Sequence, residues 1–167
     1  MATEIAEWRR GEFLVSTDRA RLDLDVIHGF LTNSYWAKGI SRELVGRSLE
    51  HSLCFGIYDE SGSKGPGFAN AASPEAPQAG FCRVVSDLAT VAYLGDVFVL
   101  EKYRGRGLSK FLMECTTQHP ALEGLRRWIL LTRDAHGLYR QNGWKDIVGP
   151  ERWMEVTPDA PLYPPVA

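Results

Sequence analysis

The chain of 167 residues carries a net charge of −2, with 24% charged and 44% hydrophobic residues. This length is enough for one domain with a sizeable core, and the composition is that of a globular protein rather than a disordered one. Because the sequence contains no basic block, it lacks the charge expected of a protein that binds a nucleic-acid backbone. We therefore expect no nucleic-acid partner.

The N-terminal run and the cysteines indicate a compartment. The run MATEIAEWRRGEF has no apolar core of a signal peptide, and no stretch of the chain reaches the length of a membrane span. The three cysteines have no paired or CxxC spacing, which is typical of small buried residues in a reducing environment: Cys54, Cys82 and Cys115. We expect a cytoplasmic protein with no membrane partner.

In the first half of the chain, apolar residues at helical spacing alternate with strand-like runs. The predicted elements are a strand over 12–16, a helix with Leu24, Ile27, Phe30 and Leu31 on its inner face, a helix capped by Ser41, and a strand over 52–58. Segment 59–78 is rich in Gly, Pro, Ser and Ala and predicts a flexible insertion between strands. A solvated loop and a lid over a substrate are both open interpretations of it.

The second half predicts a hairpin followed by strand and helix in alternation. Its elements are strands over 80–86 and 90–100 joined by the turn DLAT, a helix with Leu108, Phe111, Leu112 and Cys115 on one face, a buried strand over 126–133, a helix over 135–142 and a last strand over 151–156. The order predicts one mixed α/β (α+β) domain over residues 1–167. The strand over 90–100 is expected to run directly into a glycine-containing turn.

That turn is the run YRGRGLSKFL, residues 103–112. A strand, a glycine turn and a helix in this order expose the first N–H groups of the helix, which bind anions and above all phosphates. A Walker loop needs GxxxxGK[ST], which is absent. A dinucleotide-binding GxGxxG fingerprint would need a third glycine where Lys110 stands.

The run resembles the acyl-CoA loop of the GNAT superfamily of N-acetyltransferases, whose pattern is Arg/Gln-x-x-Gly-x-Gly/Ala. Residues 104–109, RGRGLS, match it with Ser109 in the last small position. A second block, RWILLTRDAHGLYRQNGW, is similar to the fifth strand and fourth helix of that family. The positions that match there are Ala135, Leu138, Tyr139, Gly143 and the aromatic Trp144.

The resemblance implies a mostly antiparallel sheet, flanked by helices, whose fourth and fifth strands (90–100 and 126–133) splay apart around acetyl-CoA. It also implies the residues that bind this cosubstrate. The pantetheine arm would bond to the strand backbone at Val97, Phe98 and Val99, and the pyrophosphate would bond to Arg104, Gly105, Arg106, Gly107, Leu108 and Ser109. Thr132 stands where family members often have an asparagine that assists CoA binding.

The resemblance also implies catalytic roles. Tyr139 occupies the position of the tyrosine that protonates the departing thiolate, and a phenol near a thiol of lower pKa can do so. Asp96 is the only carboxylate of the strand over 90–100 and is the candidate base, with Gly95 where some relatives have Glu. An ion pair is the alternative for Asp96. His136 is a second candidate base, with a structural role as the alternative.

Tyr35 and Trp36 lie in the predicted connection between the first two helices, a region that walls the acceptor site in this family. They are expected to line an acceptor pocket, where aromatic faces would suit a cationic amine. The alternative is that they only pack the two helices together.

The expected function is acetyl-CoA-dependent N-acetyltransfer to a primary amine of a small molecule or protein, by direct attack in a ternary complex. No metal is expected, because His28 and His51 fall on separate helices without ligand spacing. A non-catalytic acyl-CoA-binding sensor or interaction module of the same fold is the alternative. A homodimer is one of the assembly states left open.

Overall fold

The structure is a computed structural model, and it describes residues 4–63 and 76–157. Six strands form one sheet in the order β1-β2-β3-β4-β5-β6, in which only β5 and β6 are parallel neighbours. The strands are β1 (Glu7–Arg10), β2 (Phe13–Ser16), β3 (Leu53–Asp59), β4 (Gln78–Ser86), β5 (Val91–Val99) and β6 (Arg127–Ile129). The helices are α1 (Leu24–Leu31), α2 (Arg42–Glu50), α3 (Leu108–Thr117) and α4 (His136–Gln141). The mixed, mostly antiparallel fold predicted from the sequence is therefore confirmed.

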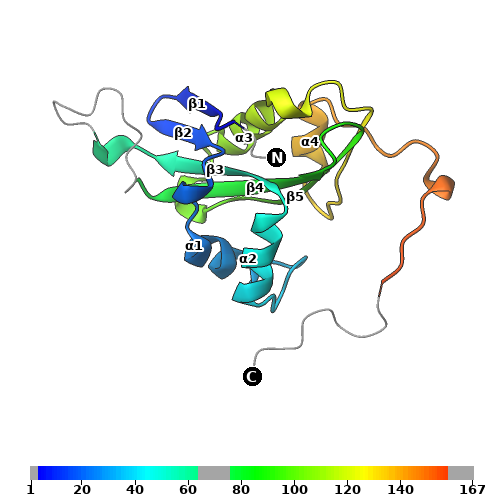
Figure 1. Cartoon of the computed structure of the whole chain (residues 1–167), viewed down its shortest axis with the longest axis horizontal. Helices are drawn as coiled ribbons and strands as arrows, with labels where there is room; N and C mark the ends of the chain where they lie inside the picture. The colour runs from blue at the N-terminus through cyan, green and yellow to red at the C-terminus, as the bar shows by residue number, and fades with distance from the viewer. Residues whose placement is uncertain (1–3, 64–75, 158–167) are drawn as a thin grey trace.

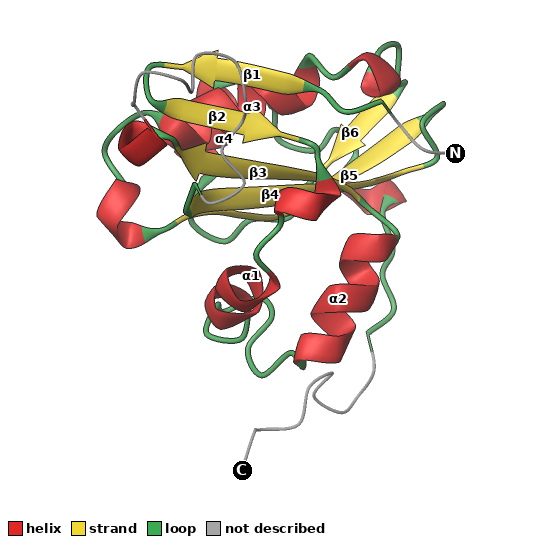
Figure 2. Ribbon diagram, turned by 60° about the vertical axis from the view of Figure 1, so that its left-hand side comes forward, coloured by secondary structure: helices red, strands yellow, loops and turns green. Residues whose placement is uncertain are grey.

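Helices cover both faces of the sheet, with α1 and α2 on one face and α3 and α4 on the other (Figures 1 and 2). Strand residues alternate between the two layers, as the period of two requires. Phe55 and Ile57 of β3 pack into the core under α3, whereas Cys54 packs into the core beneath α1 and α2. Strand β5 contributes to both cores, with Ala92 and Leu94 in the one under α3 and Phe98 in the one beneath α1 and α2.

The first two helices begin at side-chain caps, and the cap of the second, Ser41, is the one that the sequence predicts. Asp23 caps α1 by accepting hydrogen bonds from two backbone N–H groups, and the Ser41 hydroxyl caps α2 by accepting from Leu44 N–H. Ile27 and Leu31 are buried on the predicted inner face of α1. These local signals orient α1 and α2, and so they position the connection between them over β5.

One strand was not predicted. The hairpin of β1 and β2 turns at Gly11, which has a φ of 59°. β1 has three charged residues out of four and only one side chain that packs inward, Trp8, so it shows no alternating pattern. Trp8 contacts the rings of Phe55 and His119, and this contact ties the outer strand to the core.

The C-terminal strand prediction was wrong. Residues 151–156 do not join the sheet; Pro150–Arg152 form a 3-10 turn, and the chain continues without regular structure. Apolar residues favour a strand only when one face of it is buried, and Met154 and Val156 are 97% and 96% exposed. The buried strand predicted over 126–133 is also shorter, because β6 ends at Ile129 and only two of its residues are partly covered.

The link from β5 to α3 differs from the sequence prediction as well. A 3-10 turn over Glu101–Tyr103 separates the strand from the glycine run, so the strand does not run directly into it. Tyr103 is buried in this turn and packs edge-on against Phe13. The turn therefore fixes the glycine run to the core at its first residue.

The insertion predicted over 59–78 joins β3 to β4, an antiparallel pair. Its middle, residues 64–75, lies outside the described residues. In the part of the chain that the structure describes, no helix has both the length and the apolar character needed to cross a membrane.

His119 generates a prediction about pH. The residue is 3% exposed, its imidazole contacts the rings of Trp8 and Phe55, and its Nδ1 accepts from Ala121 N–H at 3.1 Å. Burial lowers its pKa below the usual value of 6.5. The unfolded chain then binds more protons than the folded one, so the free energy of unfolding should fall as the pH drops below 6.5.

The measurement is urea unfolding at pH 8 and at pH 5. His119→Asn keeps an acceptor for Ala121 N–H, and it should show a smaller loss of unfolding free energy between the two pH values than the wild type. His51→Asn, at an exposed histidine, is the control and should behave as the wild type does. An equal pH dependence in all three proteins would contradict the assignment.

Candidate functional site

The N-terminus of α3 presents a row of unpaired backbone donors. Gly105 and Gly107 adopt left-handed φ values of 75° and 73°, and Gly107 is the N-cap of the helix. Within the described residues, no backbone N–H from Gly105 to Lys110 donates a hydrogen bond to another group of the protein. A Cβ at either glycine would meet no atom within 4 Å, so the space in front of these donors is open. Six consecutive N–H groups at a helix N-terminus can hold a phosphate or diphosphate.

The arginines of the run have separate contacts. Arg104 donates from Nε to the Val99 carbonyl at 3.4 Å, and Arg106 forms an ion pair with Glu12 while its guanidinium lies 4.6 Å from the Phe13 ring. Both arginines are exposed. The backbone amides are therefore the groups of the run that lack a hydrogen-bond partner among the described residues. Arg106 contacts β2, and Arg104 contacts the end of β5.

Next to this run, β5 and β6 splay apart. Their parallel pairing covers three residue pairs and ends at Tyr93 and Ile129, whereas β5 continues to Val99. Over 94–99, β5 therefore has no partner strand on this side within the described part of the chain. Val97, Phe98 and Val99 fall in this free stretch, so the splay and the predicted backbone edge are both present.

An extra residue bends β5 inside the free stretch. Phe81 pairs with Phe98 but Arg83 pairs with Gly95, so β5 uses one more residue than β4 over the same length. Asp96 lies in this bulge with a φ of 55°, a left-handed conformation that costs a non-glycine residue about 1 kcal/mol or more. The bulge exchanges the two faces of the strand. Ala92 and Leu94 precede it in the α3 core, and beyond it Phe98 faces the α1–α2 core.

Tyr139 projects from α4 toward this region. It is 8% exposed and packs edge-on against Trp144 at 5.9 Å. Its hydroxyl makes no hydrogen bond with any residue that the structure describes, and burial raises the pKa of this phenol to about 12. The phenol therefore stays protonated at neutral pH and has a free proton to donate.

The connection between α1 and α2 reaches across to both splayed strands. The Trp36 indole donates from Nε1 to Asp96 Oδ1 at 3.0 Å. The Tyr35 hydroxyl accepts from Arg133 N–H at 3.1 Å, and the Arg133 guanidinium lies 3.8 Å from the Tyr35 ring. The two aromatic side chains are 44% and 41% exposed. They meet edge-on at 4.9 Å and form an exposed wall beside β5.

Asp96 has no free oxygen in this arrangement. Oδ2 pairs with Arg83 Nε and Oδ1 accepts from Trp36. Neither Arg83 nor Arg133 was singled out from the sequence. For Arg83 a signal existed, because it is the only charged residue in the apolar run GFCRVVS, and a charge inside a buried strand needs a partner. The role of Arg133 depends on a loop contact with Tyr35, 98 positions away in sequence.

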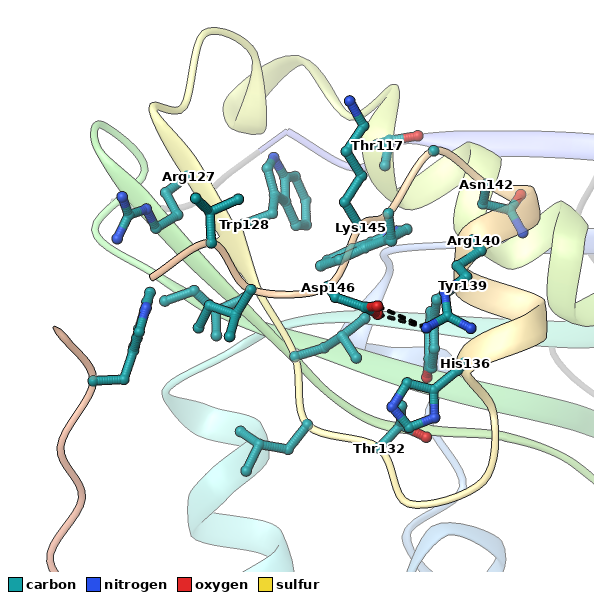
Figure 3. Close-up of a pocket in the computed structure, with 18 residues that line it drawn as sticks. Thr117, Arg127, Trp128, Thr132, His136, Tyr139, Arg140, Asn142, Lys145 and Asp146 are labelled. Carbon is teal, nitrogen blue, oxygen red and sulfur yellow. Dashed lines mark hydrogen bonds and ion pairs between the residues drawn. The ribbon is translucent and has the colours of Figure 1, made fainter. Parts of the chain in front are cut away.

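A cavity of about 890 Å³ opens beside α4 (Figure 3). Tyr139, His136 and Thr132 line one wall of it, and Trp128 of β6 stands opposite. No residue of β5 or of 104–109 lines it, so this cavity is not the gap between β5 and β6. Thr132 accepts a hydrogen bond from Ala135 N–H at 3.0 Å, which holds the start of α4 and leaves the hydroxyl proton of Thr132 free.

The three cysteines are poor nucleophiles in this structure. All three cysteines are free and buried, and burial raises the pKa of Cys54 to about 11 and of Cys115 to about 12, with Cys82 shifted in the same direction. No group of three or more His, Cys, Asp or Glu able to hold a metal ion occurs among the described residues.

Comparison with protein families identifies the part of the chain that carries this geometry. A family model described as an acetyltransferase (GNAT) domain matches residues 51–146, more than half of the chain. The matched range includes the glycine run and Tyr139. A protein of Gibberella zeae named "putative acetyltransferase" is 34% identical over 153 residues, covering 86% of this chain and 85% of that protein.

Solved structures share the fold. A "putative acetyltransferase" of the GNAT family from Xanthomonas campestris pv. campestris has a TM-score of 0.76 at 44% identity, with 88% of this chain and 94% of that chain covered. Glucosamine-6-phosphate N-acetyltransferase from Arabidopsis thaliana has a TM-score of 0.56 at 18% identity, with 88% and 99% covered. The second likeness is one of fold alone.

The open glycine run generates a matched pair of variants. Gly107 and Gly124 have φ values of 73° and 74°, a Cβ added at either would meet no atom within 4 Å, and Gly124 lies away from the α3 N-terminus. Alanine at either position should cost about 1 kcal/mol of stability. Only Gly107→Ala should also reduce the rise in melting temperature that inorganic pyrophosphate produces. Equal responses of the two variants to pyrophosphate would contradict the anion site.

Proposed function

Because this chain belongs to the GNAT family of acetyltransferases, we propose that it transfers an acetyl group from acetyl-CoA to the primary amine of a small molecule or protein. The observation that carries the proposal is the row of six unpaired N–H groups from Gly105 to Lys110. It lies beside a splayed strand pair. A buried tyrosine with a free hydroxyl stands on the adjacent helix.

The residues present fit acetyl-CoA. The N–H groups from Gly105 to Ser109 would hold the pyrophosphate with the aid of the α3 dipole, and Arg104 and Arg106 would lie close to the phosphates. The unpaired edge of β5 over Val97–Val99 would bond to the amides of the pantetheine arm. Thr132 lines the cavity beside α4 rather than the gap between β5 and β6, so its part in CoA binding stays a prediction.

Acetyl-CoA supplies an activated acyl group, and this chain supplies position and a proton. In the transfer, the amine nitrogen forms a bond to the acyl carbon while the carbon–sulfur bond breaks and its electron pair goes to sulfur. The Tyr139 phenol donates a proton to that sulfur. Burial keeps this phenol protonated across neutral pH, so it can donate a hydrogen bond, and then its proton, to the sulfur as negative charge grows there. The proton that the amine loses replaces the one that the phenol gives.

Direct attack by the amine is favoured over an acyl-enzyme. A cysteine nucleophile reacts as the thiolate, and burial disfavours the thiolate of each cysteine in the chain. All three are also buried. The acceptor and acetyl-CoA would therefore be bound together before transfer.

The identity of the base stays a prediction. For Asp96 to take a proton from the amine, it would have to release Trp36 or Arg83, because both of its oxygens are engaged. His136, at the start of α4, is the other candidate, and its side chain lines the cavity beside Tyr139. A water chain to bulk solvent is a third route for the proton.

The engaged Asp96 also supports a second candidate function. A site without a free base would suit a module that binds acyl-CoA but does not transfer the acyl group. The discriminating experiment is a screen of amines with acetyl-CoA, read by release of the free thiol. We expect turnover with at least one amine; a CoA-induced rise in melting temperature without turnover on any amine would favour the binding module.

The role of Tyr139 can be tested separately from binding. Tyr139→Phe should lower kcat about 100-fold or more, in line with the effect of a general acid. The Kd for CoA should stay within about threefold, because the phenol proton is used in the transfer step and not in CoA binding. Kinetics with the best amine and calorimetry with CoA are the measurements. Tyr58→Phe, at a buried tyrosine of β3, is the control and should keep wild-type kcat.

Unchanged kcat in Tyr139→Phe would remove the residue from the mechanism. Because the pKa of Tyr139 is about 12, ionisation of this phenol should not lower kcat until the pH is well above 10. A descending limb near pH 8 that disappears in Tyr139→Phe would contradict the raised pKa.

A further inference from the structure

We infer that Arg83 and Asp96 are positioning residues that hold the connection between α1 and α2, through the Trp36 indole, as the wall of the acceptor site. The inference rests on the proposed function, because it assigns these residues to the acceptor side of the same site. It gives Asp96 a role other than that of a base, and it adds Arg83 to the functional residues.

A continuous chain of polar contacts supports the assignment. Arg83 Nη1 on β4 donates a hydrogen bond at 3.2 Å to the hydroxyl of Ser52, which lies directly before β3. Arg83 pairs with Asp96 on β5, and Asp96 accepts from the Trp36 indole at 3.0 Å. The side chains of Arg83 and Asp96 are only 21% and 11% exposed. A largely covered ion pair directs its remaining acceptor, Asp96 Oδ1, at a single donor on the neighbouring loop.

The backbone of β5 points the carboxylate at that donor. Without the extra residue in the bulge, Asp96 would share the face of Ala92 and Leu94 and would project into the apolar core under α3. With a φ of 55°, it projects instead toward the α1–α2 side, where Arg83 and Trp36 meet it. The contacts of Asp96 with Arg83 and Trp36 therefore offset the cost of this strained backbone conformation.

The same loop is held at a second point. The Tyr35 hydroxyl accepts from the backbone N–H of Arg133, and the Arg133 guanidinium stacks on the Tyr35 ring. Trp36 is tied to β5, and Tyr35 is tied to the segment after β6. The loop therefore bridges the two splayed strands at the point where their pairing has ended. Movement of this bridge would change the space that an amine can occupy.

Besides the hydrogen bond to Asp96, the ring of Trp36 contacts the Tyr35 ring of the same loop at 4.9 Å and one ring outside the loop. It lies 6.2 Å from Phe30, which itself stacks on Phe98 at 4.0 Å, and it is 41% exposed. Its indole N–H has Asp96 as its one described acceptor. Loss of this hydrogen bond should free the ring and weaken the acceptor wall without any effect on the CoA side of the site.

The test uses Trp36→Phe, Asp96→Ala, their double variant and Asp96→Asn, with the best amine of the screen. Trp36→Phe and Asp96→Ala should each raise the KM for the amine about tenfold, the size expected for one hydrogen bond to a charged group. The KM for acetyl-CoA and kcat should stay within about threefold. The double variant should be no worse than either single one, since both remove the same contact.

Asp96→Asn separates positioning from base catalysis. The amide oxygen can still accept from the indole, so the KM for the amine and kcat should both stay near those of the wild type. A kcat lowered 100-fold or more in Asp96→Asn, with the KM for the amine unchanged, would overturn the inference in favour of a base. Additive effects of Trp36→Phe and Asp96→Ala would overturn it as well.

Two further arms complete the design. Asp25→Ala removes a carboxylate that pairs with Arg42 between the same two helices, and it is the matched control that should leave the KM for the amine unchanged. Hydrogen–deuterium exchange of residues 33–40 needs no turnover; it should be faster in Trp36→Phe and Asp96→Ala than in the wild type. A wild type that acetylates no amine would count against the proposed function, whereas unchanged exchange in both variants would count against the anchored loop.

Discussion

The early end of the pairing between β5 and β6 is the constraint on which the rest of the site depends. After three residue pairs the two parallel strands separate, and among residues 4–63 and 76–157 no other strand pairs with this edge of β5. Such an edge is unfavourable unless other groups satisfy it. In the proposed function, the pantetheine arm does so. In the same proposal, the glycine run at one end of the gap would hold the phosphates and the Tyr35–Trp36 wall at the other would border the acceptor.

The anion site combines backbone N–H groups with the charges of Arg104, Arg106 and Lys110. The whole chain is nearly neutral, and Arg106 is already paired with Glu12. The six N–H groups before and within the first turn of α3 have no such partner among the described residues. A protein of slightly negative net charge can therefore still offer a local anion site, because a helix N-terminus concentrates partial positive charge.

Local signals in the sequence predict much of the fold. Side-chain caps, apolar stripes and the hairpin turn at Asp87 all depend on neighbours within a few residues, and the structure contains them. The errors lie where long-range contacts decide. The strand β1 exists because Trp8 finds Phe55 and His119. The apolar residues over 151–156 do not pack against the sheet, and no strand forms there.

The sequence alone indicated the family and the position of Tyr139, through the resemblance of two short blocks, and it indicated the glycine run, because each of these is read from neighbouring residues. The tertiary structure alone decided what Asp96 contacts. Its direction depends on the register between β4 and β5, where one additional residue exchanges the faces of the strand. No local pattern reports that register, since it is set by packing between strands and by the Arg83 and Trp36 partners that the fold brings together.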